Sequence, residues 1–382
     1  MIDLETMSIL VVDDMKSMRL TIRKMLKHLG IGRKIQYAAN GQEGMGILHN
    51  SSIDLAIIDW NMPVMNGTEL LNYIRNDRAF RDMPVIMVTA EADKNIVYEV
   101  AETEIDAYLL KPLTLEALDS KIRQVVDEVN NPNPGTIHLL KARDYEEIGR
   151  YAEAIEETRQ ALKYKPSASR ILRKLGLLHF KIDKFAIGLK CLQKAASVNR
   201  NDAVTRYHIS QYYLNRHDLI NTTKYYMEML TISDKYIPES IDLGERLLQS
   251  NKSELGIQLF EQALNRRSKN MTHKEQVVDI SMENFEFEYA VKLLKQLIKE
   301  FPSKYEYVFT LGKAYLHMEK VEAALENFIL ADENIHNHIE AKVEIAKIYF
   351  QLNRFIVADQ YINQILKSDP GNPVAMEMRK KF

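Results

Sequence analysis

The sequence predicts a doubly wound α/β domain with a parallel sheet, followed by an all-α array of helical repeats. Two observations lead to this prediction. Short apolar runs alternate with helical stretches in the first third of the chain, which is typical of buried parallel strands. In the remainder, small residues recur at intervals of 34, and a fixed period of this length indicates stacked helical units.

Four apolar runs are predicted to be strands, and each stops at a polar side chain. The runs are 8–12, 55–58, 85–88 and 107–110, and they end at Asp13-Asp14, Asp59, Thr89 and Lys111 respectively. Ligands of such sheets gather outside the carboxyl ends of the strands. We therefore expect three carboxylates, a hydroxyl and an ammonium group to converge at one edge.

These residue types favour phosphoryl chemistry. Crowded carboxylates attract a hard cation with oxygen ligands, in this case Mg²⁺. Asp59 can act as a nucleophile toward phosphorus and form an acyl phosphate, while Lys111 neutralises the oxygens of the transferred group and Thr89 hydrogen-bonds one of them. The chain has no Gly-rich ATP cradle, so another protein or a small donor must supply the phosphoryl group.

Each residue also has an ordinary structural interpretation. Asp13 and Asp14 could cap the next helix, Thr89 could do the same, and Lys111 could be a solvated lysine. Because all five residues stand at strand ends, the joint pattern favours a site.

Residues 6–129 resemble the receiver domain of bacterial two-component response regulators, and especially the single-domain chemotaxis receiver. The motifs that carry the resemblance are Val11-Val12-Asp13-Asp14, Asp59-Trp60-Asn61-Met62-Pro63, Val88-Thr89-Ala90-Glu91 and Tyr108-Leu109-Leu110-Lys111-Pro112. The chain departs from the family at Asn66-Gly67, where Asp-Gly is frequent.

The resemblance implies a five-stranded, flavodoxin-like sheet and a role for each matched residue. Asp59 is then the phosphoacceptor, and a histidine kinase is its donor. The implied Mg²⁺ ligands are Asp13, Asp14, Asp59 and the backbone carbonyl of Asn61. Thr89 and Tyr108 form a switch pair, and Asn61 and Glu91 tune the rate at which the phosphoryl group is lost.

A domain boundary is predicted at residues 130–135, Asn-Asn-Pro-Asn-Pro-Gly. Two prolines and a glycine cannot continue the preceding helix. We therefore expect a receiver domain at 1–129, a linker at 130–135, repeats at 136–372 and a C-terminal capping helix at 373–382.

This part of the chain resembles tetratricopeptide repeats, in which each unit of 34 residues is a pair of antiparallel helices. Seven units fit without insertion. One register of small or medium-sized residues is Ala154, Gly188, Thr222, Gly256, Ala290, Ala324 and Ala358.

Solenoids of this kind present a concave surface built from the first helix of each pair. The candidate groove residues are Arg173, Phe180, Tyr207, Leu214, Ile241, Leu248, Phe309 and Phe350, with Arg143 among the neighbouring cations. Apolar side chains with scattered cations suit a peptide or an amphipathic helix of another protein. Several of these side chains could instead pack between repeats.

Net charge, cysteine content and the length of the apolar runs indicate the compartment in which the protein is expected. The net charge is −2, and there is one cysteine, Cys191, which fits a reducing compartment. No apolar run approaches membrane-spanning length. We therefore expect a cytoplasmic protein that does not bind membrane. DNA binding is not expected because no helix-turn-helix is recognisable, and a homodimer is left open.

The predicted function is that of a response regulator in a phosphorelay, a signalling protein rather than an enzyme, whose repeats bind a protein or peptide. Two alternatives remain open. One is a scaffold with a vestigial receiver, and the other is a Mg²⁺-dependent phosphatase, although the latter class requires an Asp-x-Asp motif after the first strand.

Overall fold

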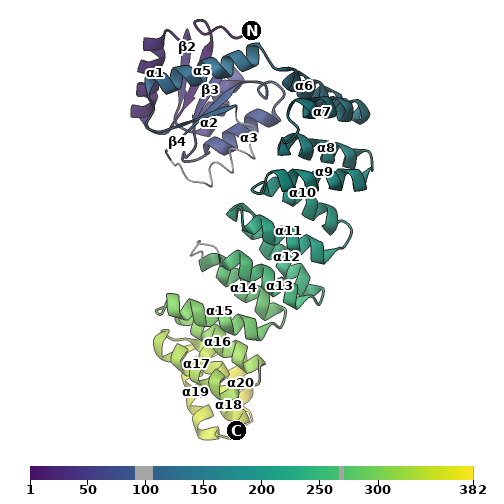
Figure 1. The fold of residues 1–382 in the computed structure, drawn as a ribbon. Coiled ribbons are helices and arrows are strands. Elements are labelled where there is room, and N and C mark those ends of the chain that lie inside the picture. The colour runs from purple at the N-terminus through teal and green to yellow at the C-terminus, as the bar shows by residue number, and fades with distance from the viewer. Residues whose placement is uncertain (91–105, 266–270, 382) are drawn as a thin grey trace. The chain divides into compact units, whose positions relative to one another are not determined.

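The computed structural model describes residues 1–90, 106–265 and 271–381 of the chain (Figure 1). These residues fall into two compact units, Met1–His217 and Asp218–Phe382. The first unit contains a sheet and the helices that follow it, and the described part of the second consists of helices. A search of the described helices found none with the length and apolar character needed to cross a membrane.

The sheet has five parallel strands in the order β2-β1-β3-β4-β5, which confirms the predicted α/β fold class. The strands are β1 (Ser8–Val12), β2 (Lys34–Ala38), β3 (Leu55–Asp59), β4 (Val85–Thr89) and β5 (Ala107–Leu110). Strands β3 and β4 are buried along their whole length, as expected of the inner strands of a sheet that is covered on both faces.

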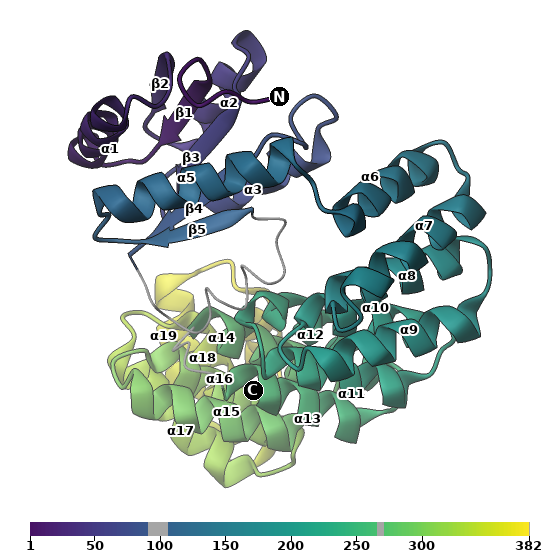
Figure 2. The same ribbon diagram turned by 45° about the horizontal axis from the view of Figure 1, so that its top comes forward.

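Helices cover both faces of the sheet (Figure 2). On one face, Ile9 and Val11 of β1 pack with α1 (Lys16–Leu29) and α5 (Leu115–Asn130). On the other, Leu10 and Val12 pack with α2 (Gly41–Asn50) and α3 (Gly67–Asn76). The alternation of side chains along one strand therefore supplies both cores.

Three residues connect the receiver-like sheet to the helices beyond it. Helix α5 ends at Asn130, and α6 begins at Pro134, with the side chain of Asn133 accepting a hydrogen bond from the backbone N–H of Thr136. Proline suits the first turn of a helix because it has no N–H to leave unpaired. The predicted linker at 130–135 is thus shortened by helix at both ends.

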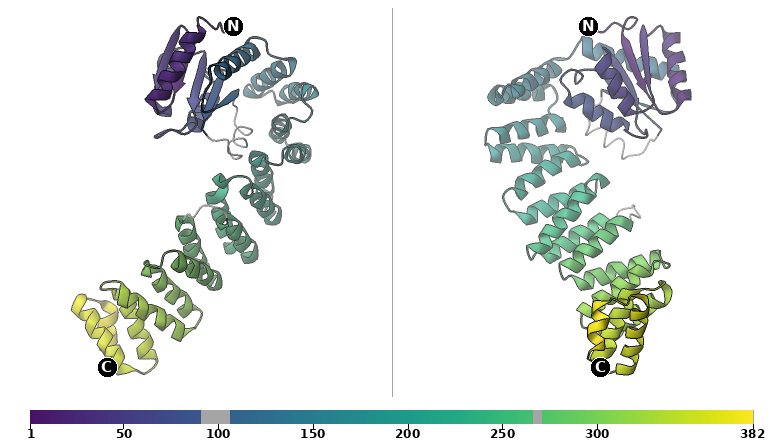
Figure 3. Two further views of the ribbon diagram at one scale, coloured as in Figure 1. Left: turned by 60° about the vertical axis from the view of Figure 1, so that its left-hand side comes forward. Right: turned by 180° about the vertical axis from the view of Figure 1, so that it is seen from behind.

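Helices make up the remainder of the described chain, and within each unit successive helices pack side by side (Figure 3). In the first unit they are α6 (Pro134–Glu147), α7 (Tyr151–Tyr164), α8 (Ser169–Lys181), α9 (Phe185–Val198) and α10 (Ala203–Leu214). In the second they are α11 (Leu219–Leu230), the short 3₁₀ helix η1 (Asp234–Tyr236), α12 (Ile237–Gln249), α13 (Ser253–Leu264), α14 (Met271–Glu283), α15 (Phe287–Glu300), α16 (Tyr305–His317), α17 (Val321–Asn334), α18 (Ile339–Gln351), α19 (Phe355–Ser368) and α20 (Pro373–Arg379).

Small residues let the paired helices approach closely. A Cβ atom on Gly176 of α8 would lie 2.9 Å from the carbonyl oxygen of Gly188 on α9. In the second unit, the ring of Phe260 on α13 occupies the space beside Gly244 of α12, where an added Cβ would lie 2.2 Å from a ring carbon. The small residues at the 34-residue interval therefore lie at helix–helix contacts.

A left-handed residue recurs in the turn between paired helices. Gly149 has a φ of 76°, and φ is 55–64° at the positions that follow it at intervals of 34. Those positions are Asp183, His217, Asn251, Phe285, Glu319 and Asn353. The turn geometry is therefore repeated as regularly as the small residues, although only the first of these positions is glycine.

Candidate functional site

Three carboxylates lie together at the carboxyl ends of β1 and β3. One oxygen from each of Asp13, Asp14 and Asp59 lies within 4.8 Å of the others. Asp13 and Asp59 are buried, and Asp14 is exposed at the mouth of the cluster. The predicted convergence of these residues is therefore present in the structure.

Lys111 closes the cluster from the end of β5. Its Nζ lies 2.7 Å from Asp59 Oδ1 and 3.0 Å from Asp13 Oδ2, and its side chain is 15% exposed. The ammonium group therefore bridges two buried carboxylates, and the interpretation of Lys111 as a solvated lysine is wrong.

The electrostatic balance of the cluster follows from burial. Burial raises the pKa of Asp59, and the nearby charges of Asp13 and Asp14 raise it further, against the opposing effect of Lys111. For Lys111, burial would lower the pKa, but the hydrogen bonds to Asp59 and Asp13 outweigh it, so the net shift is upward. A protonated lysine thus compensates part of the negative charge.

Asp13 is not the N-cap of the first helix. Helix α1 has Met15 at this position, and no side chain caps it. Asp13 Oδ1 accepts a hydrogen bond from the Met15 N–H at 2.8 Å, while Oδ2 faces Lys111. The Arg19 side chain donates to the Asp13 carbonyl at 2.5 Å, which fixes the backbone that carries the two acids.

Backbone packing positions the Asp59 end of the site. The Trp60 N–H donates to the carbonyl of Val88 at 2.8 Å, and the Gly67 N–H donates to the carbonyl of Trp60 at 3.0 Å. A Cβ atom on Gly67 would lie only 2.1 Å from the Asp59 carbonyl oxygen. Gly67 therefore packs directly against the backbone that carries Asp59.

Thr89 and Tyr108 differ in exposure. Thr89 ends β4 and is 1% exposed, and its carbonyl accepts the Lys111 N–H at 2.7 Å. Tyr108 on β5 is 44% exposed. Of the pair predicted to tune phosphoryl loss, Asn61 is exposed beside Asp59, and Glu91 lies outside the described residues.

The groove prediction is wrong for three apolar residues. Ile241, Leu248 and Phe309 are each at most 6% exposed, and the ring of Phe309 packs against Phe328 with centroids 5.5 Å apart. These side chains form the contacts between helices, so they offer no surface to a ligand.

Arg173 also has a structural role. Its Nη1 lies 2.7 Å from Asp202 Oδ1, and the two side chains are 12% and 2% exposed. Asp202 caps α10 as well, accepting hydrogen bonds from the backbone N–H and the hydroxyl of Thr205. Arg173 therefore joins α8 to the first turn of α10.

The other four groove candidates are partly exposed. They are Phe180, Tyr207, Leu214 and Phe350. Phe180 stacks on Tyr212 with centroids 5.5 Å apart, and Phe350 meets Phe355 edge to face at 5.3 Å. Part of the ring surface of Phe180 and of Phe350 is thus covered by another aromatic side chain of the repeats.

Known families match both parts of the chain. The response regulator receiver domain matches residues 9–123, and tetratricopeptide repeats match residues 139–199 and 339–372. The chemotaxis protein CheY of Pseudomonas aeruginosa is 38% identical over 124 residues, which are 32% of this chain and 99% of that protein. The chain belongs to the response regulator receiver family.

Two further similarities concern the same receiver. Chemotaxis protein CheY-3 of Vibrio cholerae is 34% identical over 33% of this chain and 95% of that protein. A solved CheY-like receiver domain protein from Methanospirillum hungatei is 31% identical over 33% of this chain and 97% of its own, with a TM-score of 0.30. The family matches identify a receiver domain joined to tetratricopeptide repeats, as the sequence predicted.

Proposed function

We propose that this protein is a phosphorelay response regulator in which Asp59 accepts a phosphoryl group from a histidine kinase. The observation that carries the proposal is the contact of Lys111 Nζ with both Asp59 and Asp13 inside a three-carboxylate cluster. This places a fixed cation beside the candidate nucleophile, which phosphoryl transfer requires because negative charge accumulates on the transferred oxygens.

The residues divide the chemistry among them. An Asp59 carboxylate oxygen attacks phosphorus and forms a P–O bond, while the bond from phosphorus to the donor breaks and its electron pair leaves with the donor. Lys111 remains protonated through this step and holds the phosphoryl oxygens. The buried setting of Asp59 limits the access of water to the acyl phosphate.

The acidic cluster fits a magnesium ion. Its donors are carboxylate oxygens from Asp13, Asp14 and Asp59, to which the backbone carbonyl of Asn61 is added as a further proposed ligand, and oxygen ligands of this kind suit Mg²⁺. When bound, the ion would supply positive charge to the oxygens of the transferred group.

We propose that the repeats form the output. Seven tetratricopeptide units over residues 136–372, with a capping helix at 373–382, would offer a surface to a protein or peptide. In the phosphorylated receiver, the Thr89 hydroxyl donates to a phosphoryl oxygen and the exposed Tyr108 turns inward, which changes the face of β5.

Mass spectrometry of the intact chain tests the function. With MgCl₂ and acetyl phosphate, the wild-type protein is expected to gain one phosphoryl group, and D59N is expected to gain none. D119N serves as the matched control, because Asp119 lies on α5, pairs with Arg123 and is not one of the three clustered carboxylates. A wild-type protein that gains no adduct at Asp59 would contradict the proposal and favour a scaffold.

A further inference from the structure

A second charged cluster lies outside the phosphoryl site, between the receiver and the first helix of the repeats. It joins the segment between α3 and β4 to α6. Arg143 of α6 forms a two-pronged pair with Asp82, Nη1 to Oδ1 at 2.6 Å and Nη2 to Oδ2 at 3.1 Å. Arg81 pairs with Glu147, one helical turn beyond Arg143, and Arg78 approaches the same carboxylate at 3.4 Å.

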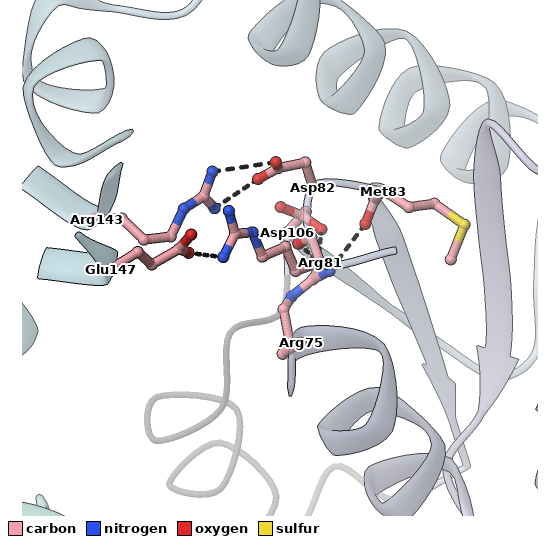
Figure 4. A network of polar contacts seen from close by, with 7 residues as sticks. All are labelled: Arg75, Arg81, Asp82, Met83, Asp106, Arg143 and Glu147. Atoms are coloured by element: carbon pink, nitrogen blue, oxygen red, sulfur yellow. Dashed lines mark hydrogen bonds and ion pairs between the residues drawn. The ribbon is translucent and has the colours of Figure 1, made fainter. Parts of the chain in front are cut away.

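The charges are crossed, as Figure 4 shows. The receiver segment offers a cation and an anion in sequence, Arg81 and Asp82, and α6 offers an anion and a cation four residues apart. Residues at this spacing share one face of a helix. Each charge therefore meets its opposite in one register only, which gives the contact an orientation as well as an attraction.

Arg75 braces the receiver side of this contact. Its Nη1 donates to the carbonyls of Arg81 at 3.0 Å and Met83 at 2.9 Å, and its Nη2 lies 2.6 Å from Asp106 Oδ2. Asp106 also accepts the N–H of Val85, the first residue of β4, at 2.7 Å. The segment that carries Arg81 and Asp82 is thereby tied to the amino ends of β4 and β5.

The contact uses a helix face that recurs through the repeats. The positions that follow Arg143 at intervals of 34 are Leu177, Gln211, Glu245, Asp279, Lys313 and Lys347, and each is partly or fully exposed. In the first repeat this position, Arg143, is also partly exposed, and it pairs with Asp82 of the receiver. A partner that binds this face of α6 must displace Asp82.

We propose that Arg81, Asp82, Arg143 and Glu147 form an interdomain latch. In this latch the receiver occupies the face of α6 that carries Arg143 and Glu147. The receiver residues of the latch lie near the amino ends of β4 and β5, whereas Asp59, Thr89 and Lys111 lie at the carboxyl ends of their strands. The closed latch therefore leaves the phosphoryl site open to a donor while it keeps a partner off α6.

Charge reversal in the full chain tests the latch. Donor and acceptor dyes are attached to N72C and K163C in a C191S background, and energy transfer is measured at low salt. D82R alone and R143D alone are each expected to raise the open population several-fold, because each places like charges together. The double variant D82R/R143D is expected to return the closed population, since it restores the pairing with the signs exchanged.

The control is E116R, which reverses an exposed charge on α5 and is expected to behave like the wild type. Adduct formation at Asp59 is measured in every variant and is expected to be unchanged, which also shows that the receiver remains folded. Single variants that keep the wild-type distribution, or a double variant that stays open, would overturn the latch. A loss of adducts in all proteins would instead contradict the proposed function.

Discussion

The site is held by backbone as much as by charged side chains. Asp13 and Asp59 are positioned by the ends of β1 and β3, and Lys111 reaches both of them from β5. A short displacement of the Asp59 backbone would change the distance of 2.7 Å between Asp59 Oδ1 and Lys111 Nζ. The packing of Gly67 against that backbone is therefore a direct test at the scale of one residue.

G67A is expected to lower the free energy of unfolding by about 1–3 kcal/mol, the usual cost of overpacking, and to slow adduct formation at Asp59. The reason is the distance of 2.1 Å that a Cβ atom would have to the Asp59 carbonyl oxygen. Urea denaturation and intact-mass kinetics are the measurements.

The matched control for this substitution is G46A. A Cβ atom on Gly46 meets nothing within 4 Å, and the residue lies inside α2. Alanine in an exposed helix interior is expected to stabilise the fold by about 0.5–1 kcal/mol. If G67A and G46A gave the same stability and the same rate of adduct formation, the close packing at Gly67 would not constrain the site.

At the scale of elements, the paired helices are joined by turns that require a left-handed residue. Gly149 adopts this conformation without cost, whereas Phe285, which is 76% exposed, adopts a φ of 64° with a bulky side chain. The left-handed region is unfavourable for residues with a Cβ atom, so these two turns differ in strain.

G149A is expected to destabilise the chain by about 1–2 kcal/mol, since nothing lies near the added Cβ atom and only the backbone conformation is penalised. F285N is expected to raise the unfolding midpoint, because asparagine tolerates this conformation better. Thermal unfolding followed by circular dichroism measures both, and changes of the same sign would refute the argument from turn strain.

Short-range patterns allowed the strands and the site to be predicted from the sequence. The apolar runs of β1, β3, β4 and β5 are fully local signals, and each is followed by its polar residue. Strand β2 lies at the edge of the sheet, and its mixed sequence Lys-Ile-Gln-Tyr-Ala is only partly buried, so it followed only from the family resemblance.

The repeat surface was harder to predict because exposure there depends on neighbouring helices. Ile241 and Phe309 have the same apolar character as Phe180, but adjacent helices cover them more completely. Arg173 was assigned to the groove from its position in the repeat. Its partner, Asp202, is 29 residues away in sequence, so no local pattern indicated the pairing. The pairing of Asp82 with Arg143 spans 61 residues and has no local signature.

At the scale of the whole molecule, the latch depends on partly exposed ion pairs. The Asp82 side chain is 60% exposed, while those of Arg81, Arg143 and Glu147 are 19–27% exposed. Pairs of this kind contribute modestly, roughly 0–1 kcal/mol each, and are weakened by salt.

Raising NaCl from about 0.05 to 0.5 M is therefore expected to increase the open population of the wild-type chain and of D82R/R143D, because the Debye length falls from over 10 Å to a few Å. The R143D single variant lacks the attraction between Arg143 and Asp82 and keeps only the pairing of Arg81 with Glu147, so it should respond less. The same energy-transfer pair measures this, and a closed population that is independent of salt would show that other contacts hold the receiver on α6.

The three residues between α5 and α6 determine what an opened receiver can do. A fully extended segment of this length spans about 11 Å, so the released receiver remains close to α6, the helix on which it docks. Rebinding is then intramolecular, with an effective concentration set by the tether rather than by the amount of protein in the cell. Dilution should not change the open fraction, and a competing partner must exceed that local concentration to keep α6 free.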